Sequence, residues 1–521
     1  MKIPGHAAAT GASRRWQGEG PWAWLSAAAV ALSLLMLGAL LVLLATRGLG
    51  HFWPADLHQL RLADGQRLIG VPVETRQLPD DSGYERRYFT ANRDHQGGIW
   101  TWVAEDAIEQ DRTPNDLIVL QRGRWGAFFG RLVAVVTETE RFGGDRAWQA
   151  LRQRLDHLEE LRQQSESLRR DHILPLIRQM ERMKEHSRLS EQLTELEQQA
   201  LTLQRAMTGT VLVLETADGK RFEQPLESVL DAWHPNSMGS VEKLAHWSRG
   251  VWQFLSEGPR DANAAGGVWP AIFGTVLMVM LMSLLVTPFG VLAAVYLNEV
   301  AHQGRLTRWV RIGVRNLAGV PSIVYGVFGL GVFVYGIGGS LDRLFYADTL
   351  PSPTFGTGGL LWASLTLALL TLPVVIVATE EGLARIPLHQ REGALALGAT
   401  HFETLTRVVL PMATPAMLTG VILAVARAAG EVAPLMLVGV AKLAPQVPVD
   451  GEFPFLHLER KFMHLGYHIY DAAFHSNDVQ AALPLVYATA LLLVLVILVL
   501  NLTAIFLRHY LRLRHGVPVR R

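Results

Sequence analysis

The feature that most constrains the fold is a set of long stretches without a charged residue. Crossing a hydrocarbon core of about 30 Å takes an α-helix of about 20 apolar residues, and each stretch is long enough. The charge-free windows are 20–46, 268–298, 316–341, 349–379 and 479–507, and a further window, 408–441, holds only Arg427 and Glu431. The sequence therefore predicts six membrane-spanning helices. The first window is longer than the apolar core of a typical cleavable signal and lacks a clear small-residue exit, so we expect a retained anchor.

Basic residues gather on alternate connecting segments, and this pattern predicts the orientation of the spans. The segments before the first span and after the second, fourth and sixth carry far more Lys and Arg than the other short loops. Loops rich in Lys and Arg stay on the cytoplasmic side of the membrane, so both termini are predicted to be cytoplasmic. Residues 51–267 then lie outside, and the chain has no cysteine with which to form a disulfide there. A formal net charge of +1 gives no indication of a nucleic-acid partner.

The external insert, 51–267, is predicted to be an α+β soluble domain that is β-rich at both ends. Asp64-Gly65 and Asp218-Gly219 each stand between alternating apolar residues, a pattern typical of a β-hairpin turn. The stretch 116–136 continues the strand pattern. We expect the two hairpins to pair in one small sheet or barrel, with a helical stretch inserted between them.

That helical stretch covers about 145–205. Apolar residues recur every three or four positions, as at Leu151, Leu155 and Leu158. Pro175 interrupts the pattern, so two helices or one kinked helix are expected. An amphipathic hairpin that packs on itself is the favoured interpretation. A coiled coil that binds a partner or oligomerises is the alternative, because apolar repeats of this kind drive both.

The loop 381–414, between the fourth and fifth windows, has more internal pattern than an ordinary connector. It contains EGALALGATHFETLTRVVLP, from Glu392 to Pro411. Gly398 is expected to end a short Ala- and Leu-rich helix outside the lipid. A second helical segment then leads to a stop at Leu410-Pro411. The small residues of the first segment leave a face on which another protein can close tightly.

This loop resembles the coupling motif of ABC-importer permeases, which is Glu-Ala-Ala, three residues, Gly, nine residues, Ile, one residue, Leu-Pro. The chain differs only in having glycine for the first alanine and valine for isoleucine. The matching residues are Glu392, Gly393, Ala394, Gly398, Val408, Leu410 and Pro411. The resemblance implies that the short helix sits in a cleft of a separate ATPase subunit, whose closure moves the membrane helices.

The chain itself shows no motor or metal motif. It has no GxxxxGK[ST] stretch, no HExxH and no Cys/His cluster. His464 and His468 are four residues apart in an external loop but lack a third ligand, so a structural or solvent-facing role is favoured over metal binding. We therefore expect a non-catalytic subunit that binds no cofactor, with ATP used by a partner.

Arg427 and Glu431 are four residues apart, and the pattern places them on one helical face near the middle of the fifth span. A charge at that depth costs roughly 3 kcal/mol on insertion scales, so it faces a cavity or pairs within the bundle. One interpretation is a salt bridge that only neutralises both groups. In the other, Glu431 holds the guanidinium while Arg427 offers spare donors to an anion in transit. Gly430 and Pro434 weaken the helix around the pair.

Together these segments resemble the phosphate-transport permeases of the PstA type, closely over about 268–510 and loosely at the first span. The matching pieces are YLNEVA (296–301), NLAGVPSIVYGVFGL (316–330), EGALALGAT (392–400) and VLPMATPAMLTGVILAVARAAGEVAPLM (409–436). The resemblance implies a mainly α-helical, six-helix type I ABC-importer bundle in the bacterial inner membrane. In that family the arginine and glutamate that match Arg427 and Glu431 are implicated in passing phosphate.

The resemblance also implies partners. These are a PstC-type permease in a heterodimer, a dimer of ATP-binding subunits, a periplasmic phosphate-binding protein, inorganic phosphate and membrane lipid. The large insert departs from the short form of the family, and no role is carried over for it.

Alternative functions stay open at this point. A permease for another oxyanion, such as molybdate, sulfate or a phosphonate, would use Arg427 equally well. A membrane-anchored sensor or interaction protein would work through the insert. An ion-coupled transporter would be expected to show more intramembrane acids than Glu431 and would not need the docking loop.

Overall fold

The computed structural model describes residues 21–514 except 78–82, 97, 183–186, 261–262, 264, 445–446, 452 and 477. The chain divides into two compact units, Phe52–Gln253 and the remainder. The insert thus ends earlier than the expected boundary at 267. The reason is local: the Val268 amide donates to the Phe254 carbonyl at 2.8 Å, and β12 (Pro259–Arg260) pairs with β13 (Ala265–Gly266), which joins this segment to the next span.

The first part of the insert is an antiparallel sheet in the order β4-β3-β2-β1-β5. Its strands are β1 (His58–Leu62), β2 (Arg67–Gln77), β3 (Tyr84–Phe89), β4 (Trp100–Ala104) and β5 (Ile108–Arg112). The predicted hairpin at Asp64-Gly65 is confirmed, since β1 pairs with β2 and Gly65 has φ +85°. Glycine adopts this left-handed backbone without strain.

The second sheet of the insert has the order β10-β9-β7-β6-β11, with β8 on β7. A short helix, α2 (Arg93–Gln96), precedes it in the chain. The strands are β6 (Ile118–Arg122), β7 (Ala127–Val136), β8 (Arg141–Gly143), β9 (Val211–Glu215), β10 (Arg221–Pro225) and β11 (Val229–Trp233). The hairpin at Asp218-Gly219 is confirmed. The expectation that both hairpins share one sheet is wrong, because β9 pairs with β7 while β1 pairs with β5.

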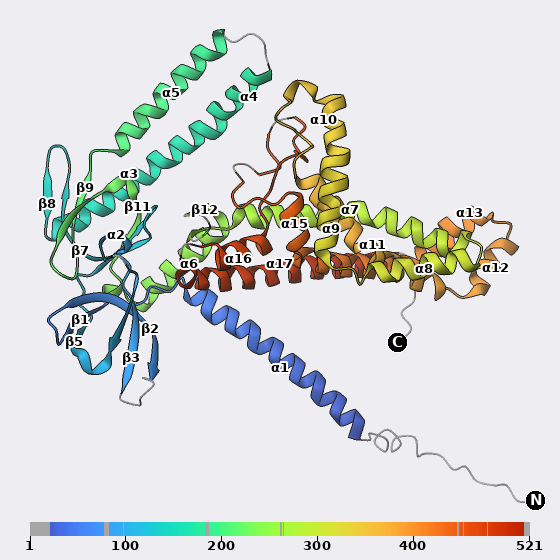
Figure 1. The fold of residues 1–521 in the computed structure, drawn as a ribbon, viewed down its shortest axis with the longest axis horizontal. Coiled ribbons are helices and arrows are strands. Elements are labelled where there is room, and N and C mark those ends of the chain that lie inside the picture. Colours follow the sequence, from blue (N-terminus) through green and yellow to red (C-terminus); the bar gives the residue numbers. More distant parts are fainter. Residues whose placement is uncertain are drawn as a thin grey trace, which may run out of the picture. The chain divides into compact units, whose positions relative to one another are not determined.

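A helical hairpin leaves this second sheet, as Figure 1 shows. It consists of α3 (Asp145–Leu168), a π-helical turn (Arg169–Ile173), α4 (Leu174–Arg182) and α5 (Ser187–Met207). The first half of α3 is buried on the sheet through Ala147, Leu151, Leu155 and Leu158. The chain does not break at Pro175, because the π-helical turn before it relieves the missing amide hydrogen bond. α4 ends at Arg182 and α5 begins at Ser187, and α3 and α4 both contact α5.

Among the described residues, six helices are long and apolar enough to cross a membrane, which confirms the predicted number. They run over Trp22–Gly50, Trp269–Val300, Ser322–Phe345, Leu360–Ala384, His401–Gly430 and Val479–Tyr510. The helical elements within them are α1 (Pro21–Gly50), α7 (Trp269–Val295), α9 (Ser322–Phe328), α10 (Gly339–Phe345), α11 (Leu360–Ala384), α13 (His401–Thr404), α14 (Leu410–Gly430) and α17 (Val479–Arg514). The third begins at Ser322 instead of 316, because a separate amphipathic helix, α8 (Arg305–Leu317), occupies the preceding residues.

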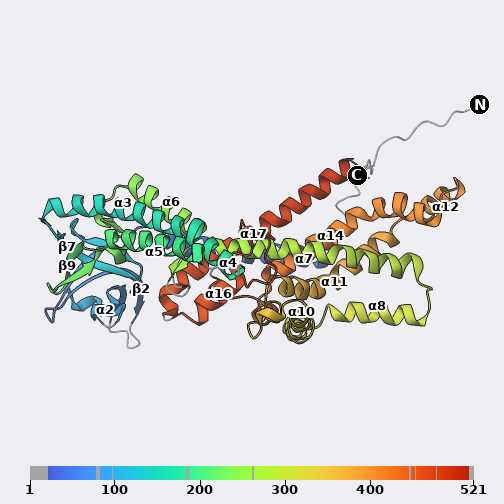
Figure 2. The ribbon, with the colours of Figure 1, turned by 90° about the horizontal axis from the view of Figure 1, so that it is seen from above.

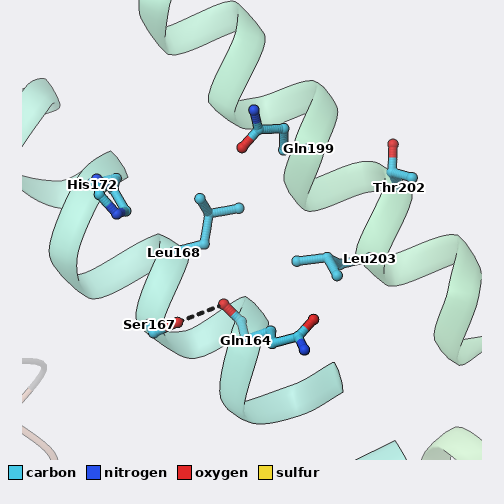
Figure 3. Close-up of a pocket in the computed structure, with 7 residues that line it drawn as sticks. All are labelled: Gln164, Ser167, Leu168, His172, Gln199, Thr202 and Leu203. Atoms are coloured by element: carbon cyan, nitrogen blue, oxygen red, sulfur yellow. Dashed lines mark hydrogen bonds between the residues drawn. The ribbon is translucent and has the colours of Figure 1, made fainter. Parts of the chain in front are cut away.

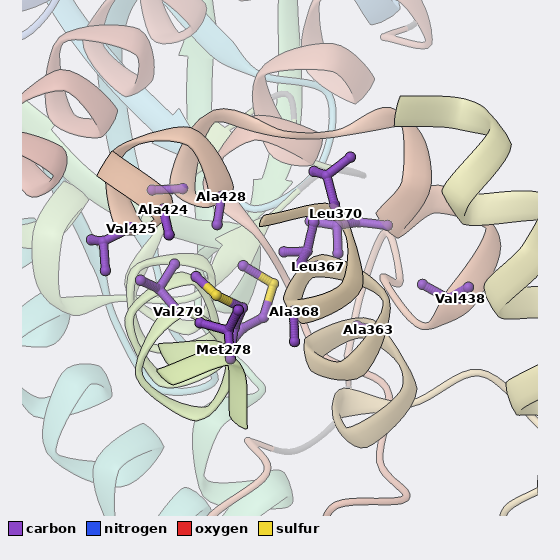
Figure 4. Packing of buried hydrophobic residues seen from close by; sticks show 14 of the residues in the cluster. Met278, Val279, Ala363, Leu367, Ala368, Leu370, Ala424, Val425, Ala428 and Val438 are labelled. Carbon is purple, nitrogen blue, oxygen red and sulfur yellow. The ribbon is translucent and has the colours of Figure 1, made fainter. Parts of the chain in front are cut away.

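The core of the membrane unit lies where α7, α11 and α14 run side by side (Figures 1 and 2). Met278, Leu367, Ala424 and Val438 are fully buried in one cluster (Figure 4). α14 approaches α11 closely at Gly420, where an added Cβ would lie 2.7 Å from Cβ of Ala378. The connecting helices are α12 (Leu388–Ala396), α15 (Ala433–Val438) and α16 (Leu465–Phe474). The helix that leads from the insert into α7 is α6 (Ser240–Ser256).

Candidate functional site

The fifth span is interrupted where its two charges lie. α14 ends at Gly430, and the next residue, Glu431, has an extended backbone with φ −79° and ψ 134°. The helix resumes only with α15. Glu431 therefore lies just beyond the helix that carries Arg427, and the prediction of one shared helical face is wrong. The sequence signal was present, because Gly430 and Pro434 flank the break.

Arg427 and Glu431 nevertheless form a pair. Nε of Arg427 lies 3.4 Å from Oε1 of Glu431, and the side chains are 32% and 20% exposed. No other hydrogen bond joins Arg427 to a residue that the structure describes. The two Nη groups of the guanidinium are thus available to a ligand, and two adjacent N–H donors suit the oxygens of an oxyanion.

The break lies inside the bundle. Ala428 and Ala429, just before it, are fully buried in the core shared with α7 and α11. α9 packs against one side, where a Cβ added to Gly326 would lie 2.7 Å from Cα of Pro434. α16 packs nearby, where a Cβ added to Gly466 would lie 2.7 Å from Cγ2 of Val432. A charged pair at a helix break within a membrane bundle is typical of a transport pathway.

The predicted loop adopts the expected helix–turn–helix form. α12 carries Glu392, Gly393 and Ala394 and ends at Ala396, and Gly398 follows with a φ of +89° that favours glycine. The Gly398 amide donates to the Leu395 carbonyl at 3.0 Å, which closes the last turn.

Large apolar side chains are exposed on this loop. Leu397 is 91% exposed, Phe402 73% and Leu388 66%. An apolar, protruding surface of this kind is typical of a site that contacts another protein.

Leu410 and Pro411 do not end the second helical segment, contrary to the prediction. The helix runs from α13 through a π-helical turn (Leu405–Val409) directly into α14. The π-helical turn accommodates the missing amide hydrogen of Pro411, so the helix continues. As a result, one helical rod joins the loop to the charged pair. The 16 residues from Pro411 to Arg427 correspond to about 24 Å at 1.5 Å per residue.

One ion pair that the sequence did not indicate anchors the loop to the bundle, and a second joins α8 to α11 just before the loop. Arg391 Nη1 donates to Glu299 Oε2 at 3.0 Å, and its Nη2 donates to the Leu383 carbonyl at 2.9 Å. Arg311 Nε donates to Glu380 Oε1 at 3.0 Å. Glu299 belongs to the YLNEVA segment, so the only signal in the sequence was its presence in a motif that resembles a known family.

His464 and His468 are buried, which fits a structural role and not a solvent-facing one. Burial lowers the pKa of His464 to about 3 and that of His468 to about 4. Nδ1 of His464 accepts from the Gly466 amide at 3.1 Å and caps α16. The uncharged imidazole is therefore the form that this packing requires.

The insert carries a groove of its own, between α3 and α5 (Figure 3). Its volume is about 460 Å³, and it is lined by Gln164, Ser167, Leu168, His172, Gln199, Thr202 and Leu203. The lining has no arginine or lysine, so it does not offer the charged donors that an oxyanion site of the Arg427 type would use.

The bundle, its interrupted span and its protruding loop define a class of protein, the membrane subunit of a transporter. A family model described as the binding-protein-dependent transport system inner membrane component matches residues 286–515. One relative, the phosphate transport system permease protein PstA 1 of Mycobacterium tuberculosis, is 32% identical over 271 residues, which are 52% of this chain and 79% of the relative. The chain therefore belongs to the family of binding-protein-dependent inner-membrane transport components. It is a multi-pass protein of the inner membrane.

Other relatives carry the same description. The PstA permease of Mycobacterium leprae is 35% identical over 208 residues, 40% of this chain and 62% of the relative. Among solved structures, the inward-facing methionine transporter MetNI superposes with a TM-score of 0.32 at 16% identity, covering 50% of this chain and 97% of the other. That score is low, so the family assignment rests on the sequence matches.

Proposed function

We propose that this chain is a permease subunit of an ATP-driven importer of inorganic phosphate. The observation that carries the proposal is Arg427, whose Nη donors remain available at a helix break inside the bundle. An oxyanion that meets this guanidinium can exchange one set of hydrogen bonds for another without leaving a buried charge unpaired. Relatives named as phosphate permeases support phosphate as the cargo.

The energy comes from a separate ATPase dimer that docks on the loop at α12, and the chain itself is non-catalytic. Exposed Leu388, Leu397 and Phe402 form the contact surface, and Glu392 provides a charge beside it. Movement of α12 reaches α13 through the turn at Gly398 and is transmitted along α14 to Arg427, because the helix is continuous from His401 to Gly430. A PstC-type permease completes the pathway, and a periplasmic phosphate-binding protein delivers the cargo.

The loop and both termini lie in the cytoplasm, and the insert lies in the bacterial periplasm. The exposed arginines of α8, among them Arg308 and Arg315, support this orientation, since positive residues are retained on the cytoplasmic side. The terminal residues 1–20 and 515–521 lie outside the described chain.

A permease for another oxyanion is the second candidate, since the guanidinium of Arg427 suits sulfate or molybdate as well as phosphate. A sensor that works through the insert is a third, and it would not require an ATPase.

The test is purification of the chain with its neighbouring gene products, followed by measurement of ATP hydrolysis with and without phosphate and its binding protein. We expect an ATPase to co-purify and phosphate to stimulate it. Arg427→Ala should abolish the stimulation while the complex still assembles, whereas Arg343→Ala, at an exposed side chain on α10, should leave it unchanged. Loss of assembly in Arg427→Ala would favour a structural salt bridge, and absence of an ATPase would favour the sensor.

A further inference from the structure

The helix α6, which leads from the insert into α7, has two different faces. One face packs on its own unit: the His246 ring lies 4.5 Å from that of Trp233, and Nζ of Lys243 lies 2.5 Å from Oδ1 of Asp56. A Cβ added to Gly250 would lie 3.5 Å from Cβ of Phe52. This face therefore rests on the segment that directly follows α1.

The opposite face presents an apolar stripe to the outside. Its members recur at intervals of three and four residues, which places them in one narrow arc of the helix. They are Val241, Leu244, Ala245, Trp252 and Leu255, and the exposed Ser248 lies within the same arc. Val241 is 81% exposed, Trp252 67% and Leu244 54%. The exposed Arg249 borders the stripe.

One membrane span begins beside the last turn of α6, and another ends close to Phe52, on which α6 packs. On one side, the Trp269 amide donates to the Glu257 carbonyl at 3.0 Å, and the Val268 amide to the Phe254 carbonyl, so the last turn of α6 adjoins the first turn of α7. On the other side, α1 ends at Gly50, two residues before Phe52. Hydrogen bonding therefore fixes the last turn of α6 beside the first turn of α7, whereas residues 51–239 separate α6 from the end of α1 in the chain.

We propose that α6 lies in the headgroup region of the outer leaflet, with its apolar stripe turned into the lipid. A helix with one apolar face and a polar opposite face binds a membrane surface, and tryptophan is enriched at that depth. Trp252 and Trp269, which is 48% exposed, then belong to one interfacial belt. The exposed Arg249 lies where it can meet lipid phosphates.

Lipid is the occupant because the stripe is apolar and exposed, carries Trp252, and belongs to a helix whose last turn is hydrogen-bonded to the start of a membrane span. The helix thus holds the insert at the membrane in addition to its two covalent connections. This inference depends on the membrane spans and not on the cargo, so it stands or fails separately from phosphate transport.

The chain has no cysteine, so single cysteines can be labelled without background. We suggest Leu244→Cys and Ser248→Cys on the stripe, each carrying an environment-sensitive fluorophore, in the full chain in lipid nanodiscs. The matched control is Leu201→Cys on α5, where the leucine is 51% exposed, close to the 54% of Leu244. Ser248→Cys changes the side chain least and guards against misfolding.

Lipids with a nitroxide near the headgroup should quench the stripe labels and not the control label, and iodide in solution should quench the stripe labels several-fold less than the control. Equal iodide quenching at all three positions would show that water covers α6. Protection from both iodide and lipid nitroxide would show that protein covers it. Either result would overturn the inference.

Discussion

Replacing Glu299 by glutamine should loosen the loop at α12 from the bundle. The Glu299 carboxylate accepts from Nη1 of Arg391 at 3.0 Å, while its other oxygen lies 3.0 Å from Nη2, and the two side chains are 17% and 22% exposed. A hydrogen bond to a charged group contributes about 1.5–3 kcal/mol. Because solvent screens this partly exposed pair, we expect a loss of about 1–2 kcal/mol. A change of that size raises the open population roughly 5–30-fold.

Hydrogen exchange on the full chain in nanodiscs measures this directly. The amides of α12 should exchange roughly 5–30-fold faster in Glu299→Gln than in the unaltered chain, because local opening exposes them. Glu381→Gln is the control, since Glu381 and Arg385 lie 3.8 Å apart and are 63% and 81% exposed. It should leave α12 unchanged. Equal protection of α12 in Glu299→Gln and the unaltered chain would refute the anchoring role of this pair.

Three further predictions follow from other parts of the chain. Gly398→Val forces a β-branched residue to φ +89°, which costs about 1–3 kcal/mol, and should uncouple ATP hydrolysis from uptake in the reconstituted complex. The control is Gly393→Ala, in open space on α12, which should keep ATP hydrolysis coupled to uptake. Normal uptake by Gly398→Val would count against docking of the ATPase on the loop. Gly420→Ala should lower the unfolding temperature, because overpacking against Ala378 costs about 1–3 kcal/mol. Gly38→Ala meets no neighbour and should leave the unfolding temperature unchanged, so equal unfolding temperatures of the two variants would contradict the packing of α14 on α11. His464 has a folded pKa near 3 and an unfolded value near 6.5, so the unfolded chain binds the proton first and stability falls by about 1.4 kcal/mol per pH unit below 6.5. His464→Asn keeps an acceptor for the Gly466 amide and does not titrate, so its unfolding temperature should fall less between pH 7 and pH 5.5 than that of the unaltered chain. An equal fall in both proteins would exclude His464 as the source of the acid sensitivity.

Features that depend on neighbouring residues in the sequence were predictable. Apolar windows indicated the spans, because a helix in lipid must be apolar over its whole length. The turns at Gly65 and Gly219 were predictable because Asp-Gly favours the required backbone angles. The end of α12 just before Gly398 follows from the same conformational freedom of glycine.

Features that depend on distant residues were not predictable. The pairing of β9 with β7 joins two strands that the helical hairpin separates in the sequence, so the local hairpin pattern holds no signal for it. The contact between Glu299 and Arg391 joins residues 92 positions apart. His464 belongs to a polar loop, yet it is buried, and the Leu465 amide beside it donates at 2.9 Å to Oγ1 of Thr275 on α7, a residue 190 positions away. The helix break at Glu431 was predictable in part. Gly430 and Pro434 indicated a weakened helix but did not show at which residue α14 ends.

ATP-driven uptake of radiolabelled phosphate into proteoliposomes that contain the assembled complex tests the central claim most directly. We predict uptake that requires ATP, is lost in Arg427→Ala and persists under an excess of sulfate or molybdate. Uptake without ATP, or uptake that sulfate or molybdate displaces as readily as unlabelled phosphate does, would contradict the proposed function.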